Sequence, residues 1–575
     1  MGMTPGTSNH RSIIFDARRD PWIGSIPLLL LAAIALIPVW TFKYFPTTDG
    51  GAHVANADVL HQYFRPAGAA YRQYYELNPL PLPNSLGHFV LALLMFVLPP
   101  LVAEKLFISA YVLLLPLSIR YAAIAIRRSA GWLAFLAVPL SLNWIFHQGF
   151  YNFLISVAVF FFLLGYWLRR RETMNARRAV VLGLLGLLLY AGHLLSITLA
   201  CAAIFILTSW FTAAQAYRLR RQGKLSWLAM TPGIASRGLL TFAGLLPAIA
   251  LVAWFQLRGY AGKPDKLQIA IFKATFWKDL FSLPIMISYR ARYEQPLALA
   301  LAALLLLLIV GAILHKIRRQ NWTRRDGLLF IPLAFSALYF TRGDQASGQL
   351  FIPQRLIFFI DLTLILFLAA QTFPMWVRRG VVGVSAILAI ALTTAHWPAY
   401  RGYNEQMDEF LEAAERIEAQ STFLPLVMSP RGLPLVVDPG GLRSQPFFSA
   451  AGYAAVNRQA IDLRNYEAGL NYFPIRYRDD VNPYKKLAIL RGKEVGLDLV
   501  PQRIDLARYM ASTRGRVDYV VLWGVTETFD GETPAARVQK LREKQDIIDQ
   551  LARDYTLIYT SPAHRARLWR LKTAK

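Results

Sequence analysis

The chain has 575 residues, of which 55% are hydrophobic, a formal net charge of +27 and a mean hydropathy of +0.35. Long runs of Leu, Ala, Val and Phe predict a polytopic α-helical membrane protein rather than several soluble domains. Many of the arginines form short clusters between apolar runs, where they orient spans in a bilayer, so no nucleic-acid partner is expected. The single cysteine, Cys201, excludes an intrachain disulfide and a cysteine metal cluster.

The N-terminal part, residues 1–21, is basic and precedes an apolar run from Trp22 to Phe42. That run is longer than the core of a signal peptide and has no clear cleavage site, so it is interpreted as an uncleaved first span with a cytoplasmic N-terminus. Later basic clusters predict further cytoplasmic positions. These clusters are Arg127–Arg128, Arg169–Arg171 with Arg177–Arg178, Arg218–Lys224, Lys316–Arg325 and Arg378–Arg379.

Segments between consecutive clusters must cross the membrane an even number of times. The segment 180–211 is short for two crossings, so a compact hairpin that turns near His193 is expected. Leu86–Val102 contains the adjacent prolines Pro99 and Pro100, which break a helix, and is expected to be juxtamembrane or re-entrant within a large external loop, 44–104. Further hairpins are expected over 131–168, over 239–314 with an external loop 258–295, and over 328–373. A last span over 381–397 brings the total to roughly eleven transmembrane helices in residues 22–399.

Residues 400–575 are predicted to form an extracytoplasmic α/β domain. Their periodicity predicts helices and strands in alternation, closed by the strand pair YTLIYTS and RARLWRL. The expected helices cover 404–419 and 534–554, and the expected strands cover 435–438 and 517–523.

The stretch PTTDGGAHVANAD follows the first span and places Asp49 at the expected membrane surface. A carboxylate there can act as a general base where a lipid-linked substrate meets a polar acceptor. The alternative is a structural role, because Asp is strongly preferred as a helix N-cap. His53 lies four residues on, on the same helical face, so Asp49 and His53 are candidate metal ligands. Two ligands alone are a weak signal, because a tight site needs three or four.

This arrangement resembles the GT-C superfamily of membrane glycosyltransferases, which includes protein O-mannosyltransferases and the lipid A aminoarabinose transferase. The resemblance rests on an acidic residue at the start of a long first external loop, juxtamembrane helices, many spans and an extracytoplasmic C-terminal domain. It implies a polyprenyl-phosphate sugar donor and a role for Asp49 as catalytic base or metal ligand. The sequence departs from the usual pair of acids, because Gly50 follows Asp49.

Other candidate substrate-binding residues lie at expected external positions. The stretch FHQGFYNFL contains His147 and Asn152, although an aromatic belt also explains its Phe and Tyr residues. His193 lies at the turn of the compact hairpin, so His53, His147 and His193 could converge on a metal ion. Arg290 and Arg292 belong to an aromatic, basic segment that either binds lipid headgroups as an amphipathic helix or closes over a lipid-phosphate donor.

Two arginines flank the short loop TRGDQASGQLFIPQR. Arg355 follows Pro353 in the first turn of a span, where it either snorkels to the headgroups or clamps the donor phosphate, with Arg342 assisting. In the C-terminal domain, Tyr466 and Tyr472 belong to a segment dense in Tyr, Asn and Arg that suits sugar or acceptor recognition. A plain arginine-rich surface loop is the alternative for that segment.

The expected function is transfer of a sugar from a polyprenyl-phosphate donor to a glycan, lipid or protein acceptor. Whether a divalent metal ion serves as cofactor is left open by the sequence. The expected location is the bacterial inner membrane, with the C-terminal domain in the periplasm. A transporter or flippase is the main alternative, but no internal repeat supports it. The strongest indication of a transporter is that two charged residues, Arg120 and Asp361, lie within predicted spans. The alternative is that they only pair with each other. A noncatalytic assembly scaffold is the third possibility.

Overall fold

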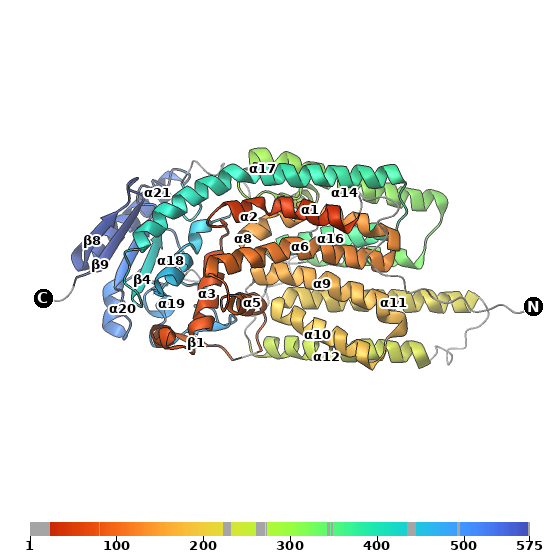
Figure 1. Ribbon diagram of the computed structural model, residues 1–575, viewed down its shortest axis with the longest axis horizontal. Coiled ribbons are helices and arrows are strands. Elements are labelled where there is room, and N and C mark those ends of the chain that lie inside the picture. Colours follow the sequence, from red (N-terminus) through yellow and green to blue (C-terminus); the bar gives the residue numbers. More distant parts are fainter. Residues whose placement is uncertain are drawn as a thin grey trace, which may run out of the picture.

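The computed structural model describes residues 24–79, 81–221, 232–259, 271, 273–341, 345–346, 349–433, 444–490 and 495–572. It consists of an elongated helical bundle with a smaller region of strands and helices at one end (Figure 1). Seven helices in the described residues are long and apolar enough to cross a membrane. The predicted total of about eleven is not confirmed, because three other helices of the bundle, α1, α10 and α15, are shorter. The chain is an integral membrane protein with a C-terminal sheet region.

The first span is broken into α1 (Ser25–Ala35) and α2 (Ile37–Thr41). The segment predicted as the first external loop begins with α3 (Gly50–Gln62). Three small elements separate α3 from α5 (Leu86–Leu94). Those small elements are η2 (Pro66–Gly68), α4 (Ala69–Tyr74) and β1 (Tyr75–Leu77). Helix α5 ends before the proline pair, and α6 (Pro100–Ile126) begins at its second member. The prolines therefore separate a short helix from a span, as the sequence predicted.

The hairpin expected over 131–168 has two unlike limbs. Its first limb is irregular and its second limb is the regular helix α9 (Tyr151–Arg170). Pro139 lies within this first limb, whose residues are almost all buried, and irregular backbone at membrane depth is tolerated where protein surrounds it. The irregular limb comprises η3 (Arg128–Leu136), α7 (Ala137–Ser141) and α8 (Trp144–Gln148). It packs against α6, α16 and α17.

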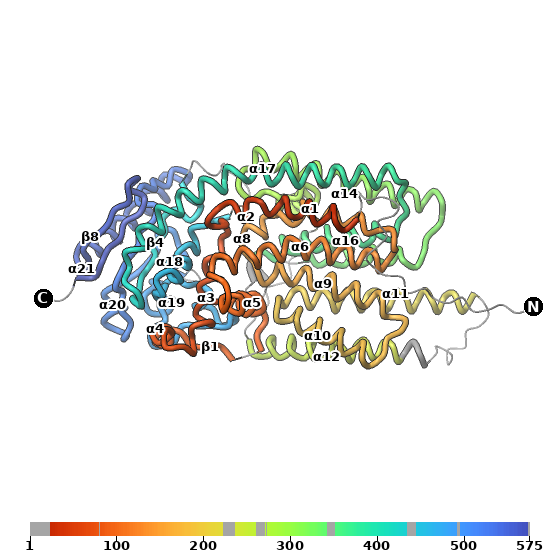
Figure 2. The backbone as a smooth tube through the Cα atoms, viewed as in Figure 1, coloured from red at the N-terminus to blue at the C-terminus, as the bar shows by residue number. Residues whose placement is uncertain are grey.

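The hairpin and its turn at His193 are confirmed as α10 (Ala176–Gly192) and α11 (Leu194–Arg221), but it is less compact than predicted, because α11 has 28 residues and is long enough to cross a membrane. The rest of the bundle consists of four long helices and the shorter elements between them (Figure 2). These are η4 (Arg171–Thr173), α12 (Pro232–Leu257), α13 (Ala274–Ser282), η6 (Pro284–Met286), α14 (Ala291–Arg319), η7 (Arg324–Leu329), α15 (Phe330–Thr341), β2 (Gln345–Ala346), β3 (Gln349–Leu350), α16 (Ile352–Ala369) and α17 (Met375–Ala414).

Helix α17 differs from the prediction of a span and a separate helix over 404–419. It is one helix of 40 residues, about 60 Å long at 1.5 Å per residue. Pro398 lies within it without ending it. The helix runs along the bundle and continues into the C-terminal region, where it packs against β7 and β9 (Figure 1).

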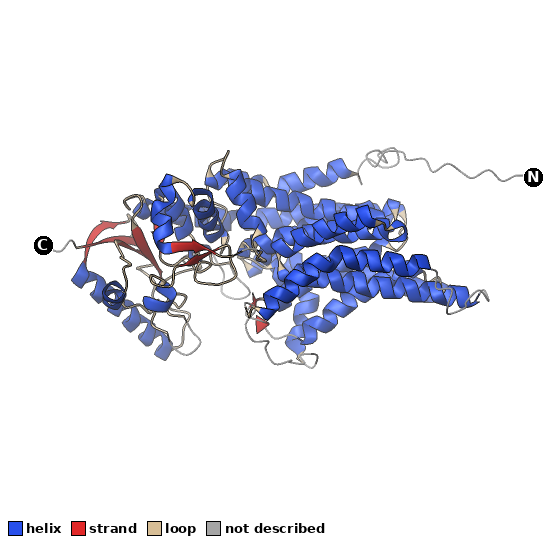
Figure 3. Ribbon diagram, turned by 90° about the horizontal axis from the view of Figure 1, so that it is seen from below, coloured by secondary structure: helices blue, strands red, loops and turns tan. Residues whose placement is uncertain are grey.

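The C-terminal region contains a five-stranded sheet in the order β5-β4-β7-β9-β8, seen at one end of the molecule in Figure 3. Strand β4 pairs in parallel with β5 and β7, and β9 pairs antiparallel with β7 and β8. The strands are β4 (Thr422–Val427), β5 (Ile461–Asp462), β6 (Ile475–Tyr477), β7 (Tyr519–Trp523), β8 (Tyr555–Thr560) and β9 (Ala566–Leu571). The helical elements are η8 (Pro446–Phe448), α18 (Ala451–Arg458), α19 (Pro483–Lys486), α20 (Leu506–Ser512) and α21 (Pro534–Asp554).

The predictions for this region divide in three. Helix α21, strand β7 and the closing strand pair are confirmed. The strand expected over 435–438 lies outside the described residues. Strand β4 was missed, and it contains Pro425, a residue that normally argues against an interior strand.

Two of the contacts that join the loop between α2 and α6 to the C-terminal region are between secondary-structure elements that position the site. Strand β1 pairs antiparallel with β6, and helix α3 packs against α18. The second contact is very close, because a Cβ on Gly51 would lie 2.0 Å from Ser449 O and one on Gly452 would lie 2.0 Å from Gly51 O. Gly51 and Gly452 therefore allow the two backbones to meet at this junction.

Candidate functional site

Asp49 lies immediately before α3, but its side chain does not cap the helix. The Gly50 N–H donates instead to Thr47 Oγ1 at 3.0 Å. The Asp49 backbone is held by α8, since Asp49 N donates to Gln148 O at 3.0 Å. Asp49 is only 8% exposed, so its carboxylate is buried although it does not serve as the helix N-cap. The N-cap alternative for Asp49 is therefore wrong.

Four side chains from distant parts of the sequence interact electrostatically with this carboxylate. Arg355 enters from the first turn of α16, while Tyr466, Glu467 and Tyr472 enter from the C-terminal region. Tyr466 hydrogen-bonds toward Asp49, and both tyrosines are electrostatic neighbours of Arg355. We call Asp49, Arg355, Tyr466, Glu467 and Tyr472 the junction site.

Arg355 is only 8% exposed and does not snorkel to a membrane surface. Its Nη1 donates to His193 Nε2 at 2.9 Å, and its guanidinium lies over the rings of Phe150 and Phe153 at 4.5 and 5.1 Å. Within the described residues it makes no ion pair, and its Nε has no hydrogen-bond partner. A buried guanidinium with a free donor and no contacting carboxylate is suited to bind an anion.

His53, His88 and Glu467 form a second group, the His–Glu cluster, in which each side chain offers one ligand atom. His53 Nδ1 lies 3.0 Å from His88 Nε2, and the Glu467 oxygens lie 3.2 Å from His53 Nδ1 and 2.8 Å from His88 Nε2. Metal–ligand bonds of about 2.0–2.2 Å place tetrahedral ligand atoms about 3.3 Å apart, so the spacing fits a divalent ion such as Zn²⁺. Asp49 is not one of the three ligands, in contrast to the pair predicted from sequence.

Amide side chains orient this cluster from behind. Asn152 accepts from Gly87 N at 2.6 Å and contacts His88 Nδ1 at 3.3 Å, on the ring edge opposite Glu467. Asn56 donates to Glu467 Oε2 and accepts from Asn465 Nδ2 at 2.6 Å. In metal sites, hydrogen-bond partners of this kind fix the orientation of the ligating ring. Asn152, predicted as a substrate-binding residue, is in the position to orient the His88 ring.

The charges of the two groups are linked. Burial, together with the negative charge of Glu467, raises the pKa of Asp49 well above its usual range, although Tyr466 and Arg355 oppose this. Burial lowers the pKa of His53 to about 4. Burial alone would raise the pKa of Glu467, but the neighbouring imidazoles and the Asn56 amide lower it. A neutral His53 beside an ionised Glu467 is the protonation state that a metal ion requires.

The three external histidines do not converge. His53 joins the His–Glu cluster and His193 contacts Arg355, whereas His147 bonds Asn143 O at 2.9 Å and Tyr400 Oη at 2.7 Å in the protein core. Through its backbone carbonyl, His147 accepts from Thr48 N at 3.1 Å. It thus supports the loop that carries Asp49.

The remaining predicted arginines take no visible part in the junction site. Arg290 and Arg292 lie over Tyr293 at 5.4 and 5.9 Å, and Arg292 is exposed. Arg342 lies outside the described residues.

The two charges within spans do not pair with each other. Arg120 Nε donates to Ser25 Oγ at 2.9 Å, and in the described part of the chain Asp361 Oδ2 has no hydrogen-bond partner. The reciprocal pairing considered from the sequence is therefore wrong.

Sequence reasoning missed His88 and Glu467. His88 lies at the end of the proline-rich stretch NPLPLPNSLGHF, and Glu467 lies beside Tyr466 in the segment already considered for recognition. Each is a single residue with no motif spacing to His53. The signal that remains in the sequence is their position, because both occur in segments expected outside the membrane.

No family model matches the chain, and none of the curated proteins matches it by sequence. Among solved structures, the chain is similar to ArnT from Cupriavidus metallidurans bound to undecaprenyl phosphate, with 12% identity, 96% of this chain and 98% of the other covered, and a TM-score of 0.45. The apo state of the same protein matches at 11% identity with a TM-score of 0.44, over 95% of this chain and 98% of the other. At this level of similarity no residue role can be transferred.

Proposed function

We propose that the protein is a membrane glycosyltransferase that moves a sugar from a polyprenyl-phosphate donor to an acceptor, at the end of the bundle that carries the C-terminal region. The observation that carries this proposal is the electrostatic interaction between Asp49, a buried carboxylate that caps no helix, and Arg355, a buried guanidinium without an ion-pair partner among the described residues. Neither group is neutralised by an ion pair among the described residues, and buried charges are costly unless neighbours or a ligand compensate them.

In this mechanism an acceptor oxygen attacks the anomeric carbon of the donor sugar. The new C–O bond forms as the bond from that carbon to the lipid phosphate breaks, and its electron pair leaves with the phosphate. Asp49 accepts the proton of the acceptor, and burial, which raises its pKa, makes its carboxylate a stronger base. Arg355 stabilises the negative charge on the departing phosphate.

Tyr466 and Tyr472 are assigned to the sugar or acceptor, because they face the same two charged groups from the C-terminal side. The His–Glu cluster is assigned to a divalent metal ion held by His53, His88 and Glu467. Such an ion would supply a fixed positive charge that supports Glu467, next to Asp49. It would also tie α3 and α5 to the C-terminal region.

The location that accompanies this function is the bacterial inner membrane, with the N-terminus in the cytoplasm and the C-terminal region in the periplasm. The arginine clusters support this orientation, since they gather at the end of the bundle opposite the junction site. Undecaprenyl phosphate, which is bound to the similar ArnT structure, is the carrier lipid proposed here as well.

The decisive experiment compares Asp49→Asn with Asp58→Asn in the full-length protein. Asp58 is a matched control, because it is also a buried carboxylate of the same loop, on α3, and accepts from Tyr71 Oη at 2.8 Å away from Arg355. Loss of a general base predicts at least a 100-fold fall in transfer from undecaprenyl-phosphate sugars for Asp49→Asn. Asp58→Asn should retain most activity. Near-normal transfer by Asp49→Asn, in protein that folds and inserts normally, would reject the proposed role.

A further inference from the structure

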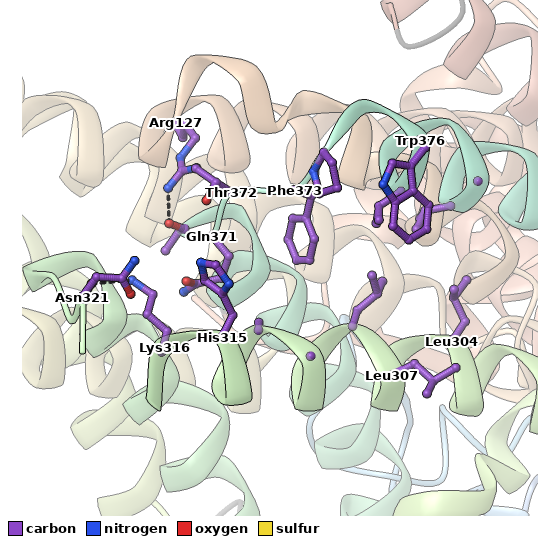
Figure 4. Close-up of a pocket in the computed structure, with 18 of the residues that line it drawn as sticks. Arg127, Leu304, Leu307, His315, Lys316, Asn321, Gln371, Thr372, Phe373 and Trp376 are labelled. Atoms are coloured by element: carbon purple, nitrogen blue, oxygen red, sulfur yellow. Dashed lines mark hydrogen bonds between the residues drawn. The ribbon is translucent and has the colours of Figure 1, made fainter. Parts of the chain in front are cut away.

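A groove of about 750 Å³ lies between α14 and α17, at the end of the bundle opposite the junction site (Figure 4). The ends of α6 and α16 close it on one side. Nothing in the proposed transfer reaction uses this groove.

One half of the groove is apolar. Leu304, Leu307 and Trp376 line it, and Leu307 and Trp376 are 71% and 76% exposed. Gly311 and Gly380 leave open space on its two walls, since no atom lies within 4 Å of a Cβ placed on either. Side chains of this kind on spanning helices accept a hydrocarbon chain rather than water.

The other half is basic, and Figure 4 shows Arg127, His315 and Lys316 gathered there, away from the leucines. Lys316 is neutralised, because its Nζ lies 3.0 Å from Asp326 Oδ2. Arg127 donates to the Ala370 carbonyl but makes no ion pair within the described residues. Among the described residues, its charged neighbours are Arg325, Arg378 and Asp326, so positive charge is in excess around Arg127.

The boundary between the two halves matches the level of a membrane surface. Trp376 occupies the first turn of α17, just before Arg378 and Arg379, and tryptophan and arginine are both enriched at the headgroup level. A basic pocket between spanning helices, with an apolar groove below it, is complementary in charge and shape to an anionic lipid.

We propose that this groove binds an anionic phospholipid of the bilayer, with the phosphate on Arg127 and His315 and an acyl chain along α14 and α17. The ligand is a constitutive membrane lipid and not the sugar donor, so this site is independent of the proposed transferase reaction.

The test is native mass spectrometry of the full-length protein with defined lipids. Phosphatidylglycerol should bind at least tenfold more tightly than phosphatidylcholine. Glycerol phosphate, which has the phosphate but no chains, should not compete with it. Equal binding of the two phospholipids would overturn the proposal, as would tighter binding of undecaprenyl phosphate at the same site.

Groove-filling variants make the test specific without removing a charge. Gly311→Leu and Gly380→Leu should each lower phosphatidylglycerol affinity at least tenfold, because the new side chain occupies the space of the acyl chain. Gly383→Leu is the matched control, since Gly383 is also open on α17 but does not line the groove.

Arg127→Gln should weaken binding about fivefold, the effect of one basic residue near a lipid surface. Unchanged affinity in both filled variants would overturn the proposal even if Arg127→Gln proved unstable.

Discussion

The two ends of the helical bundle use charge in opposite ways. At the junction end, Asp49, Arg355 and Glu467 are almost entirely buried and are held by residues from distant segments. At the other end, arginines such as Arg128 and Arg319 are exposed beside spanning helices. Charge at a membrane surface is solvated and orients the protein, whereas buried charge is costly and persists where neighbours or a ligand compensate it. The comparison therefore separates the charges that set topology from those that can perform chemistry.

The largest expected effect concerns Arg355. If its planar fork clamps the donor phosphate, Arg355→Lys should reduce turnover about 100-fold or more, because an ammonium cannot reproduce two parallel hydrogen bonds. Steady-state transfer with an undecaprenyl-phosphate sugar measures this. Arg292→Lys, at an exposed arginine, should leave turnover almost unchanged. Similar turnover in both lysine variants would show that Arg355 does not bind the donor phosphate and that its charge only serves membrane topology.

The next effect concerns the metal proposed for the His–Glu cluster. Purified protein should contain about one divalent ion per chain, and His88→Ala should lose it, because two of three ligands do not hold an ion tightly. Asn152→Ala leaves the three ligands in place but removes the amide that contacts His88 Nδ1 and Gly87 N, and should weaken metal affinity by about 10–100-fold. Elemental analysis and competition with a chelator measure both quantities.

His61→Ala is the control for this prediction. His61 lies on the same helix as His53, but its ring contacts Arg65 and lies outside the cluster. Metal-free wild-type protein that also fails to bind added Zn²⁺ would show that the three side chains form only a hydrogen-bonded group.

A smaller effect concerns the close contact between α3 and α18. Gly51→Ala should destabilise the protein by about 1–3 kcal/mol, because the added methyl meets the Ser449 backbone, which cannot move aside as a side chain can. Gly238→Ala, in open space on α12, should not destabilise it. Thermal unfolding in detergent compares them. Equal melting temperatures would mean that the two regions are joined more loosely than the backbone contact implies.

The last effect, which is largest at pH values above about 6, is the cost of one buried acid, Asp462. Burial raises the pKa of Asp462 to about 6, despite the Arg464 N–H that it accepts at 2.8 Å. A raised folded-state pKa means that the stability contributed by this group is complete below pH 4 and is lost as the pH rises through about 6. The difference from the ordinary aspartate value corresponds to roughly 3 kcal/mol.

Asp462→Asn should therefore raise the melting temperature at pH 7.5 by a few degrees and have little effect at pH 4, since the amide can still accept from Arg464 N. Melting curves of wild type and variant across this pH range measure the difference. A gap between them that widens toward low pH would contradict the sign.

The sequence by itself determined the features that depend on local chemistry. Apolar runs and arginine clusters identify an integral membrane protein, and Pro99–Pro100 sets the start of α6 because prolines cannot continue a helix. Periodicity found helix α21 and the closing strand pair. Asp49 was identified by its position after the first span, and the segment that holds Tyr466 by its composition.

Only the tertiary structure decided what depends on contacts between distant residues. It placed Glu467 between His53 and His88, across more than 370 positions of sequence, and no local pattern encodes such a meeting. It showed that the first N–H of α3 donates to Thr47 and not to Asp49. The sequence could not decide this, because a capping preference does not say which of two nearby side-chain oxygens accepts the hydrogen bond. It also joined a span and a surface helix into α17, because packing along the bundle and sheet supports one continuous helix despite Pro398.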